Sequence, residues 1–337
     1  MIKLGMIGAG RIGRLHGDNI ARFIKGAKLE AISDPYLTDD AKQWAADLGV
    51  TKVYKEADEI FNDPEIDAVL ICSSTDTHSK YLMEAAKAKK HIFCEKPIDL
   101  DIARIKEAIK AADDADVKLM VGFVRRFDRD HKGVAQVVKS GQLGKPHLIK
   151  ITSRDPEPPP LEYVKVSGGI FTDMMIHDFD MARFLAGSEV TEVTAIGQIC
   201  ITPGIAQYDD VDTAIVSLKF ENGAIGVIDN SRAARYGYDQ RVEVHCDKGA
   251  VLDENNLENH IKISTKDGVE IAKPTWFFLQ RYNDAFVAEV QDFVDALVND
   301  TQMPVGGIDG LMSVYIAQAA KISLDEKRTV LISELTE

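Results

Sequence analysis

The amino terminus contains the pattern that most restricts the fold, an apolar run followed by three closely spaced glycines. The run IKLGMI is typical of a buried strand, and Gly8, Gly10 and Gly13 follow it in G-x-G-x-x-G spacing, before a segment with helical character. Such glycines allow a tight turn, close approach of the backbone to a pyrophosphate, and close packing of helix on strand. Alone, the motif is a weak signal, because glycine turns also end ordinary strands.

A second strand and its terminal acid strengthen this interpretation. AKLEAIS predicts a strand, and Asp34 follows it, about 20 residues after the third glycine, the spacing of an acid that binds the adenosine ribose. A carboxylate there repels a 2′-phosphate, and Pro35 and Tyr36 offer no cation to bind one. The pattern therefore predicts a dinucleotide site that takes NAD rather than NADP.

Strands and helices then alternate up to about residue 122. Helices are expected near 38–48, 77–89 and 100–113, between short apolar strands such as AVLICSS and HIFCEKP. Continuous apolar strands separated by amphipathic helices indicate a doubly wound parallel sheet covered on both faces. Ligands of such sheets bind beyond the carboxyl ends of the strands, so the cofactor crevice should be lined by the CEKP segment and by Ser73, Ser74 and Thr75.

The pattern changes near residue 122, where we place the boundary between an NAD-binding domain of residues 1–122 and a second domain of residues 123–337. In the second part, three strand pairs meet at the turns ENG, DKG and KDG, which connect antiparallel neighbours. This predicts an α+β domain built on an antiparallel sheet. Amphipathic segments near 283–298 and 307–322 close the chain.

The segment GGIFTDMMIHDFDMARF, residues 168–184, places polar groups in apolar surroundings. On one helix, Asp173, His177 and Asp180 would share a face. They are candidates for metal ligands, for a solvated surface stripe, or for an acid/base pair that faces a pocket. No further His or Cys cluster completes a metal site, and the apolar neighbours leave little exposed surface, so the pattern favours the pocket. A carboxylate beside an imidazole stabilises its protonated form, as a general base requires.

Composition excludes several other classes of protein. The chain has 337 residues, and 40 basic against 54 acidic residues give a net charge of −14, which argues against nucleic acids and anionic membranes as partners. No apolar run approaches the roughly 18 residues needed to cross a bilayer, and the amino terminus is not built like a signal peptide, so we expect a cytoplasmic protein. The four cysteines lack CxxC spacing, which favours buried free thiols.

Seven motifs occur in one order along the chain: GAGRIG, SDP, CEKP, GFVRRFD, SRDPEPPP, GGIFTDMMIHDFDMARF and YGYDQR. Together they resemble the glucose-fructose oxidoreductase and inositol dehydrogenase (Gfo/Idh/MocA) family, most closely its bacterial inositol 2-dehydrogenases. The resemblance covers nearly the whole chain. It implies an α/β protein with a Rossmann domain, then a substrate-binding domain whose open-faced, largely antiparallel sheet mediates oligomerisation, with a homotetramer as the expected state.

The resemblance also implies site residues. It identifies a catalytic set of Lys96, Asp173 and His177, and substrate contacts at Lys96, Arg126, Asp155, Thr172, Asp173, His177 and Tyr236. Together with the glycine motif, it places the cofactor at Gly8, Gly10, Arg11, Ile12, Gly13, Asp34, Ser73, Ser74, Thr75, His78, Glu95 and Lys96. It implies no metal, and it leaves open whether the Lys96–Pro97 bond is cis.

Simpler structural roles remain open for several of these residues. A loop Asp such as Asp155, before Pro156, is often a turn former, and Tyr236 could simply cover the sheet. A lysine directly after a strand, such as Lys96, is often solvated. The order of motifs favours the functional interpretation without excluding these alternatives.

We therefore expect NAD-dependent oxidation of myo-inositol to the 2-keto inositol (2-inosose). His177 would act as the general base, Asp173 would orient it, and Lys96 would bind the reacting oxygen. Within the family, the alternative is a scyllo-inositol dehydrogenase or another sugar or polyol dehydrogenase. The alternative of another class is a regulator that senses NAD without turnover, which would have no need of a proton acceptor.

Overall fold

The computed structural model describes residues 1–336 and divides the chain into two compact units. The first unit contains Met1–Phe127 and Asp284–Val314, and the second contains Asp128–Asn283 and the chain from Tyr315 onward. The sequence had suggested a single boundary at residues 122 and 123, with a second domain that runs to the carboxyl terminus. The chain instead passes between the units three times, because residues 284–314 return to the first unit.

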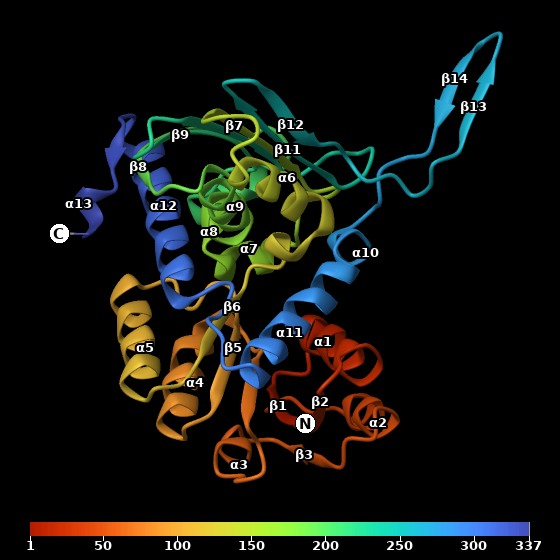
Figure 1. Ribbon diagram of the computed structural model, residues 1–337, viewed down its shortest axis with the longest axis vertical. Coiled ribbons are helices and arrows are strands. Elements are labelled where there is room, and N and C mark those ends of the chain that lie inside the picture. Colours follow the sequence, from red (N-terminus) through yellow and green to blue (C-terminus); the bar gives the residue numbers. More distant parts are fainter. Residues whose placement is uncertain (337) are drawn as a thin grey trace. The chain divides into compact units, whose positions relative to one another are not determined.

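The first unit is built on a six-stranded sheet in the order β3-β2-β1-β4-β5-β6 (Figure 1). Every neighbouring pair in it is parallel. The strands are β1 (Ile2–Ile7), β2 (Ala27–Ser33), β3 (Lys52–Tyr54), β4 (Ala68–Ile71), β5 (His91–Glu95) and β6 (Leu119–Gly122). The prediction of a doubly wound parallel sheet is confirmed.

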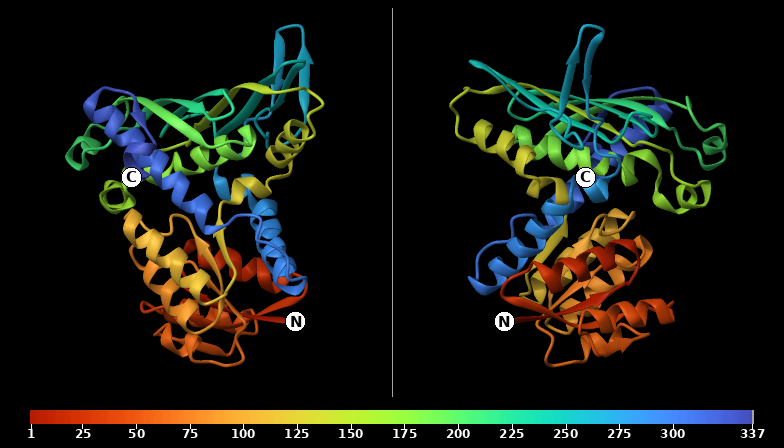
Figure 2. Two further views of the ribbon diagram at one scale, coloured as in Figure 1. Left: turned by 60° about the vertical axis from the view of Figure 1, so that its left-hand side comes forward. Right: turned by 90° about the vertical axis from the view of Figure 1, so that its right-hand side faces the viewer.

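Helices cover both faces of this sheet. Figure 2 shows α4 and α5 along one face and α1 and α11 along the other. The helical segments of the unit are α1 (Arg11–Arg22), α2 (Asp39–Asp47), α3 (Asp58–Phe61), α4 (Thr75–Lys87), α5 (Ile102–Asp114), η1 (Val124–Phe127), α11 (Asn283–Val298) and the first part of α12 (Gly307–Glu326). The central strands β4 and β5 are almost wholly buried, as parallel strands covered on both sides must be, whereas the edge strand β3 is only half-buried.

Helix α11 belongs to the first unit because its apolar side chains pack there. Phe293 meets Phe93 of β5 edge-on, with ring centroids 5.8 Å apart, and Phe286 meets the ring of His16 on α1 at 5.6 Å. Both phenylalanines are buried. The sequence predicted this helix but not the sheet against which it packs.

The second unit contains a seven-stranded sheet in the order β12-β11-β7-β10-β9-β8-β15. Only β7 and β10 pair in parallel, so the sheet is largely antiparallel as expected. Its strands are β7 (Pro146–Arg154), β8 (Val190–Gln198), β9 (Thr213–Phe220), β10 (Ile225–Ser231), β11 (Asp239–Cys246), β12 (Gly249–Asp253) and β15 (Val330–Leu331). The three predicted glycine turns join β9 to β10, β11 to β12, and β13 (Lys262–Thr265) to β14 (Gly268–Ile271).

One face of this sheet is covered and the other is open. Figure 2 shows α6 and α9 beneath the sheet, and the opposite face carries no helix in the described chain. The helical segments of the unit are α6 (Arg129–Lys139), α7 (Leu161–Ser167), α8 (Gly169–Asp173), α9 (Ile176–Ala186), η2 (Pro203–Tyr208), α10 (Phe278–Arg281), the end of α12 and α13 (Ser333–Thr336). The alternation of buried and exposed residues along β9 follows from this one-sided cover.

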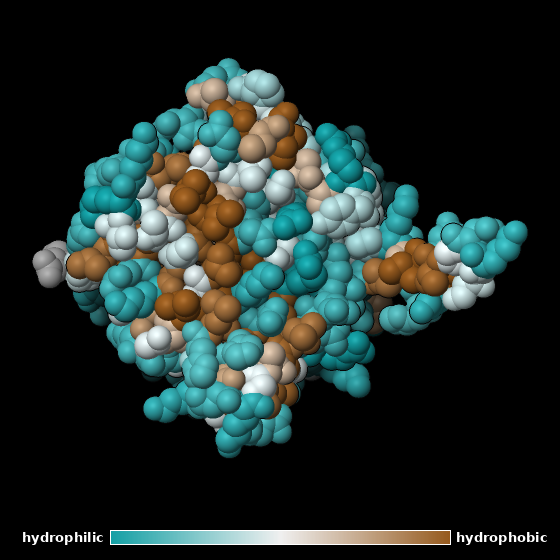
Figure 3. Space-filling view, turned by 90° about the horizontal axis from the view of Figure 1, so that it is seen from above, coloured by the Kyte–Doolittle hydropathy of each residue, from teal (hydrophilic) through white to brown (hydrophobic). Residues whose placement is uncertain are grey.

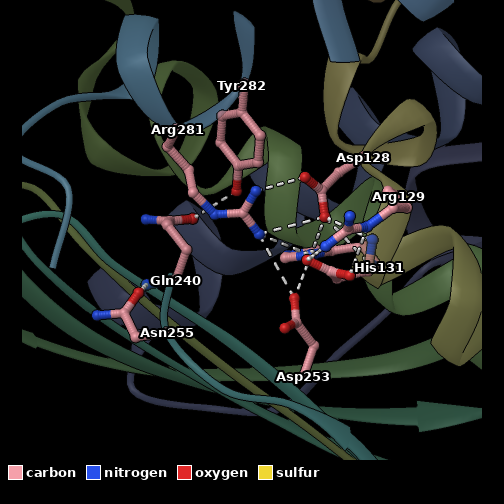
Figure 4. Close-up of polar contacts among 9 residues, drawn as sticks. Asp128, Arg129, His131, Gln240, Asp253, Asn255, Arg281 and Tyr282 are labelled. Atoms are coloured by element: carbon pink, nitrogen blue, oxygen red, sulfur yellow. Dashed lines mark hydrogen bonds and ion pairs between the residues drawn. The ribbon is translucent and has the colours of Figure 1, made fainter. Parts of the chain in front are cut away.

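A buried cluster of charges lies within the second unit (Figure 4). Arg281 donates hydrogen bonds to both carboxylate oxygens of Asp128, and its Nη2 lies 3.5 Å from Oδ2 of Asp253. Nδ1 of His131 lies 2.9 Å from Asp128 and 2.8 Å from Asp253. Two carboxylates thus share a guanidinium and an imidazole away from solvent, and Asp128 and Arg281 lie close to two of the three chain passages between the units.

Charge pairing outweighs desolvation in this cluster. Burial lowers the pKa of His131, but the hydrogen bonds and charges of Asp128 and Asp253 raise it above its ordinary value. Burial likewise raises the pKa of Asp128, whereas His131 and Arg281 hold that pKa well below its usual range. Folding therefore favours the charged form of both residues.

Two further sequence expectations concern thiols and membranes. Cys72, Cys94 and Cys246 are buried free cysteines, as predicted, but Cys200 is exposed, because it follows the end of β8 in a loop outside the core. Among residues 1–336, none of the helices is both long and apolar enough to cross a bilayer.

Candidate active site

The glycine turn of the first unit has the geometry expected from its spacing. At Gly8, φ is +101°, and a Cβ there would lie 2.6 Å from the carbonyl oxygen of Cys72. A Cβ at Gly13 would lie 2.0 Å from the carbonyl oxygen of Gly8, so the start of α1 can pack on the turn only with glycine. At Gly10, by contrast, a Cβ would meet no described atom within 4 Å. This space adjoins the amino terminus of α1, which favours an anion, so the turn fits a pyrophosphate.

Asp34 lies beside this turn, at the carboxyl end of β2. Its Oδ2 accepts a hydrogen bond of 2.7 Å from the backbone N–H of Ala9, and its Oδ1 accepts one of 2.8 Å from Tyr36. Each carboxylate oxygen retains further acceptor capacity, so ribose hydroxyls can bind to the same group. The structure places the acid beside the glycine turn, as the spacing predicted.

A buried histidine links the loops that follow β4 and β5. Nδ1 of His78 lies 2.8 Å from the carbonyl oxygen of Pro97, and its Nε2 lies 3.0 Å from that of Ser73. Ser74 stands directly before α4, and Thr75 begins this helix. His78 thus fixes the carboxyl-terminal edge of the sheet, and its direct contact with the cofactor stays a prediction.

Glu95 and Lys96 lie at the same edge. The Lys96–Pro97 peptide bond is cis, which settles the question left open by the sequence. Lys96 is partly exposed in the first unit, whereas the carboxylate of Glu95 lies 2.8 Å from Nε2 of His16. Arg11 and Ile12 begin α1 on the other side of the glycine turn.

The segment predicted as one helix with a polar face is in fact two short helices. α8 ends at Asp173, and α9 begins at Ile176. At the break, the backbone N–H groups of Met174 and Met175 both donate to the carbonyl of Ile170, at 3.1 and 2.8 Å, so the second bond spans five residues. This π-type turn interrupts the helical spacing on which the prediction relied.

Three polar side chains in this segment keep partial exposure in the second unit. Between Ile170 and Arg183, every residue is buried except Thr172, Asp173 and His177. Asp180, which helical spacing had grouped with them, is 1% exposed and lies 3.8 Å from Arg183. The accessible polar groups are therefore those predicted to contact the substrate, without Asp180.

Asp173 is held by two residues that the sequence did not identify. The hydroxyl of Tyr163 donates a 2.7 Å hydrogen bond to Oδ1, and both Nη atoms of Arg232 lie 3.4 Å from Oδ2. Arg232 is 1% exposed, and a buried guanidinium requires a carboxylate partner. Its signal in the sequence is a charged residue placed directly after β10, a strand in which alternate residues are buried.

The remaining substrate-contact candidates have protein partners in the structure. Arg126 donates a 2.8 Å hydrogen bond to Asp309 within the first unit. Tyr236 donates one of 2.5 Å to Asp239, which agrees with the simpler role of covering the sheet. Asp155 forms backbone hydrogen bonds just beyond β7. Substrate contacts by these residues stay predictions.

Two groups of side chains in residues 1–336 lie close enough to share a metal ion. One is His16, Glu95 and Glu289 in the first unit, and the other is Asp128, His131 and Asp253 in the second. Neither group includes Asp173 or His177. In the second group, the charge of Arg281 opposes a cation.

Comparisons with known proteins cover nearly the whole chain. Residues 2–123 match the family described as oxidoreductase family, NAD-binding Rossmann fold, and residues 131–252 match the GFO/IDH/MocA C-terminal domain. The chain is 47% identical over 334 residues to a myo-inositol 2-dehydrogenase of Thermotoga maritima, covering 99% of both, and 42% identical over 339 residues to an inositol 2-dehydrogenase of Rhizobium meliloti, covering 98% of this chain and 99% of that one. A crystal structure of scyllo-inositol dehydrogenase from Lactobacillus casei with bound NAD(H) and scyllo-inositol is similar at a TM-score of 0.91, with 30% identity and 99% of both chains covered.

Proposed function

Because the chain belongs to the GFO/IDH/MocA family of NAD-binding oxidoreductases, we propose that it oxidises myo-inositol to the 2-keto inositol, with NAD as the hydride acceptor. The observation that carries the proposal is the partial exposure of Thr172, Asp173 and His177 in a segment, residues 170–183, that is otherwise buried, in a chain 47% identical to a myo-inositol 2-dehydrogenase. Partly exposed groups able to hold and move a proton are what the oxidation of an alcohol needs.

In the proposed reaction, His177 accepts the proton of a ring hydroxyl while the hydrogen on the same carbon leaves with its electron pair. The bound NAD supplies the acceptor for this hydride. Asp173, held by Tyr163 and Arg232, orients His177 and stabilises its protonated form. Lys96 donates a hydrogen bond to the oxygen as negative charge develops on it. The O–H electron pair becomes the second bond of the carbonyl, so one proton and one hydride leave the alcohol.

A scyllo-inositol dehydrogenase, or a dehydrogenase of another sugar or polyol, is the second candidate. It is favoured by the similarity to the Lactobacillus casei enzyme, whose structure contains scyllo-inositol. The two inositols differ only in the orientation of one ring hydroxyl, which pocket shape decides. The regulator without turnover finds no support in the comparisons.

The direct test is an assay of the purified protein with NAD and a panel of myo-inositol, scyllo-inositol and monosaccharides. We expect formation of NADH with myo-inositol, and transfer of deuterium to the cofactor from myo-inositol labelled at C2. Binding of NAD without turnover of any polyol would disprove the proposal. Faster turnover of scyllo-inositol would select the second candidate.

Cofactor preference provides a prediction centred on Asp34. A carboxylate about 4 Å from a 2′-phosphate costs on the order of 4 kcal/mol per unit charge at an effective dielectric near 20, before screening. Even part of this repulsion should make kcat/KM higher with NAD than with NADP by roughly one to two orders of magnitude. Asp34→Ala should narrow this ratio, and equal use of both cofactors by the unchanged protein would contradict the role of Asp34.

We further propose that the chain assembles through the open face of its second-unit sheet. Five large apolar side chains point outward from this face, and Figure 3 shows brown apolar surface across it. They are Leu148, Ile196, Ile215, Ile225 and Leu252, which are 37% to 71% exposed. Ile196 pairs directly with Ile215, and Ile225 pairs directly with Leu148. Ile215 also pairs with Asp229, which lies four residues from Ile225 in β10, so all four apolar residues share one face. A contiguous apolar sheet face normally meets a partner.

The arm formed by β13 and β14 supports the same proposal. It extends away from the sheet in Figure 1, and all eight of its strand residues are exposed. Ile263, Val269 and Ile271 are each more than half exposed. A two-stranded hairpin alone is only marginally stable in water, so contact with another copy of the chain would explain its apolar residues.

For the assembly, we expect light scattering to show a homotetramer at micromolar concentration. The double variant Ile196→Lys/Ile215→Lys should shift the protein towards smaller species, because four or more charges would then face one another in the interface. A Lys219→Ala variant on the same face, where an exposed lysine pairs with Glu192, serves as the control. A monomeric wild-type protein would contradict the proposal.

A cytoplasmic location also stays a proposal. Free thiols at Cys72, Cys94, Cys200 and Cys246 are compatible with a reducing compartment. Fractionation of cells that express the protein would test it.

A further inference from the structure

Three ionisable side chains of the first unit converge from distant parts of the sequence. His16 lies on α1, Glu95 ends β5, and Glu289 lies on α11. Nε2 of His16 lies 2.8 Å from Oε1 of Glu95 and 3.9 Å from Oε1 of Glu289. The side chains of His16 and Glu289 are fully buried, and neither carboxylate oxygen of Glu289 has a hydrogen-bond partner among the described residues. The proposed reaction assigns no role to His16 or Glu289.

Aromatic rings exclude water from this cluster. The ring of His16 meets Phe93 edge-on, with centroids 5.4 Å apart, and meets Phe286 at 5.6 Å. In such surroundings two neighbouring carboxylates cannot both remain charged at low cost. Burial, and then the charge of Glu95, raise the pKa of Glu289 well above its ordinary range. Folding therefore favours the protonated form of Glu289.

The carboxylate of Glu95 is confined from two sides. Alternate side chains of a strand share a face, so Phe93 and Glu95 both point towards α1. His16 binds Oε1, and a Cβ at Gly122 would lie only 3.1 Å from Oε2. The end of β5 is thus fixed by its last side chain, immediately before Lys96.

We infer that His16 is a positioning residue, whose hydrogen bond to Glu95 fixes the end of β5 and so sets the position of Lys96 during hydride transfer. The inference rests on the proposed function, in which Lys96 binds the reacting oxygen. A displacement of about 1 Å at a catalytic group can lower a rate about 10²-fold. A buried hydrogen bond one residue away from Lys96 can therefore control kcat.

A divalent cation is the competing occupant of the cluster, because its three donor atoms lie within 4.8 Å of one another. A cation would require Glu289 to ionise and His16 to turn its nitrogen from Glu95 to the metal. The 2.8 Å contact between His16 and Glu95 already has the length of a direct hydrogen bond. The geometry favours the hydrogen bond over the metal.

The first test compares His16→Leu, which removes the donor, with His16→Gln, which keeps an N–H near the position of Nε2. We expect kcat for myo-inositol to fall roughly 10- to 100-fold in His16→Leu, with KM for NAD nearly unchanged. His16→Gln should restore most of the loss. Equal losses in both variants, or a change confined to KM for NAD, would overturn the inference.

Two glycine-to-alanine variants test the position of the Glu95 carboxylate without any change at His16. Gly122→Ala would push the carboxylate of Glu95 by a few tenths of an ångström, so kcat should fall while the binding of NAD is retained. Gly306→Ala is the matched control, since its Cβ would meet no described atom within 4 Å. An unchanged kcat in Gly122→Ala counts against the inference.

A readout that needs no turnover separates the inference from the proposed function. The rate at which acetic anhydride labels Lys96, measured by mass spectrometry relative to the exposed Lys87, should change severalfold in His16→Leu and return in His16→Gln. This holds even if the protein oxidises no inositol, which would disprove only the function. Unchanged labelling in His16→Leu would overturn the inference, and one tightly bound metal per chain that is lost in Glu289→Gln would replace it with a metal site.

Discussion

Replacing His177 with alanine is expected to lower kcat for myo-inositol oxidation by about 10²- to 10⁴-fold while the affinity for NAD is retained. In the proposed reaction the imidazole serves the proton transfer, whereas the glycine turn and Asp34, which are proposed to bind the other end of the cofactor, lie in the first unit. Steady-state kinetics at neutral pH give kcat, and the quenching of protein fluorescence by NADH gives the affinity. Near wild-type oxidation by His177→Ala would show that another group is the base.

A second histidine of the same unit provides a matched control. His147 also lies beside an aspartate, with 2.6 Å between Nε2 and Oδ1 of Asp247, but its side chain is 52% exposed. His147→Ala should therefore leave kcat unchanged. The kcat of Asp173→Asn should lie between those of His177→Ala and His147→Ala. Asparagine can still accept a hydrogen bond but no longer stabilises the imidazolium by charge. If all three variants lost activity equally, the effect would be on folding.

The glycine turn and the hairpins were predictable because their constraints are local. Gly8 needs its positive φ and Gly13 needs its missing Cβ for contacts with atoms a few residues away or in the next strand. The Asn-Gly turn between β9 and β10 is specified in the same way, since Gly223 has a φ of +88°. Such requirements restrict which residue type can occupy the position, so they can be read from the sequence.

The break between α8 and α9 requires no particular residue type, so the sequence does not show it. Met174 and Met175 are buried on all sides, and a segment that is apolar all round has no periodicity from which to read its helical phase. Tertiary packing therefore decides where the helix is interrupted. The prediction selected the accessible residues Asp173 and His177 for the site, whereas Asp180, which would share their face on an unbroken helix, is buried beside Arg183.

The return of residues 284–314 to the first unit is likewise decided by tertiary packing and not by the local sequence. Phe286, Val290 and Phe293 form an apolar stripe that predicts a helix, yet the stripe would serve equally well against either sheet. Its actual partners lie far away in sequence, since Phe293 packs on Phe93, 200 residues earlier. The order of elements along the chain therefore suggested the wrong unit.

Buried charges were the least predictable feature. A lone Arg or Glu in a sequence is most often exposed, and Arg232, Arg281 and Glu289 carry no local sign that they are not. Burial becomes possible only through partners that the fold brings together, such as Asp173 for Arg232 and Asp128 for Arg281. The structure was needed to find them.

Among these buried charges, Arg281 is the one whose removal should change the stability most. Arg281→Met removes the guanidinium but keeps much of its apolar length, so His131 is left as the cation that contacts both Asp128 and Asp253. Removing one partner of a buried ion pair typically costs about 3–5 kcal/mol in the free energy of unfolding. Urea denaturation in a Trp44→Phe background measures this cost for the second unit, because Trp276 is then the remaining tryptophan.

The pH dependence of this cost has a definite sign. The pKa of His131 is raised by folding, so the stability it contributes is complete below about pH 6.5 and is lost as the pH rises through its folded pKa. In Arg281→Met the two carboxylates depend on His131 for their positive partner, so the loss of stability relative to wild type should widen over that rise in pH. The control is Arg129→Met, which removes a cation whose side chain is 91% exposed and should cost at most about 1 kcal/mol at any pH. If Arg281→Met were no less stable than Arg129→Met, the buried cluster would contribute nothing to the stability of the second unit, and its role would have to be sought in the chain passages beside Asp128 and Arg281.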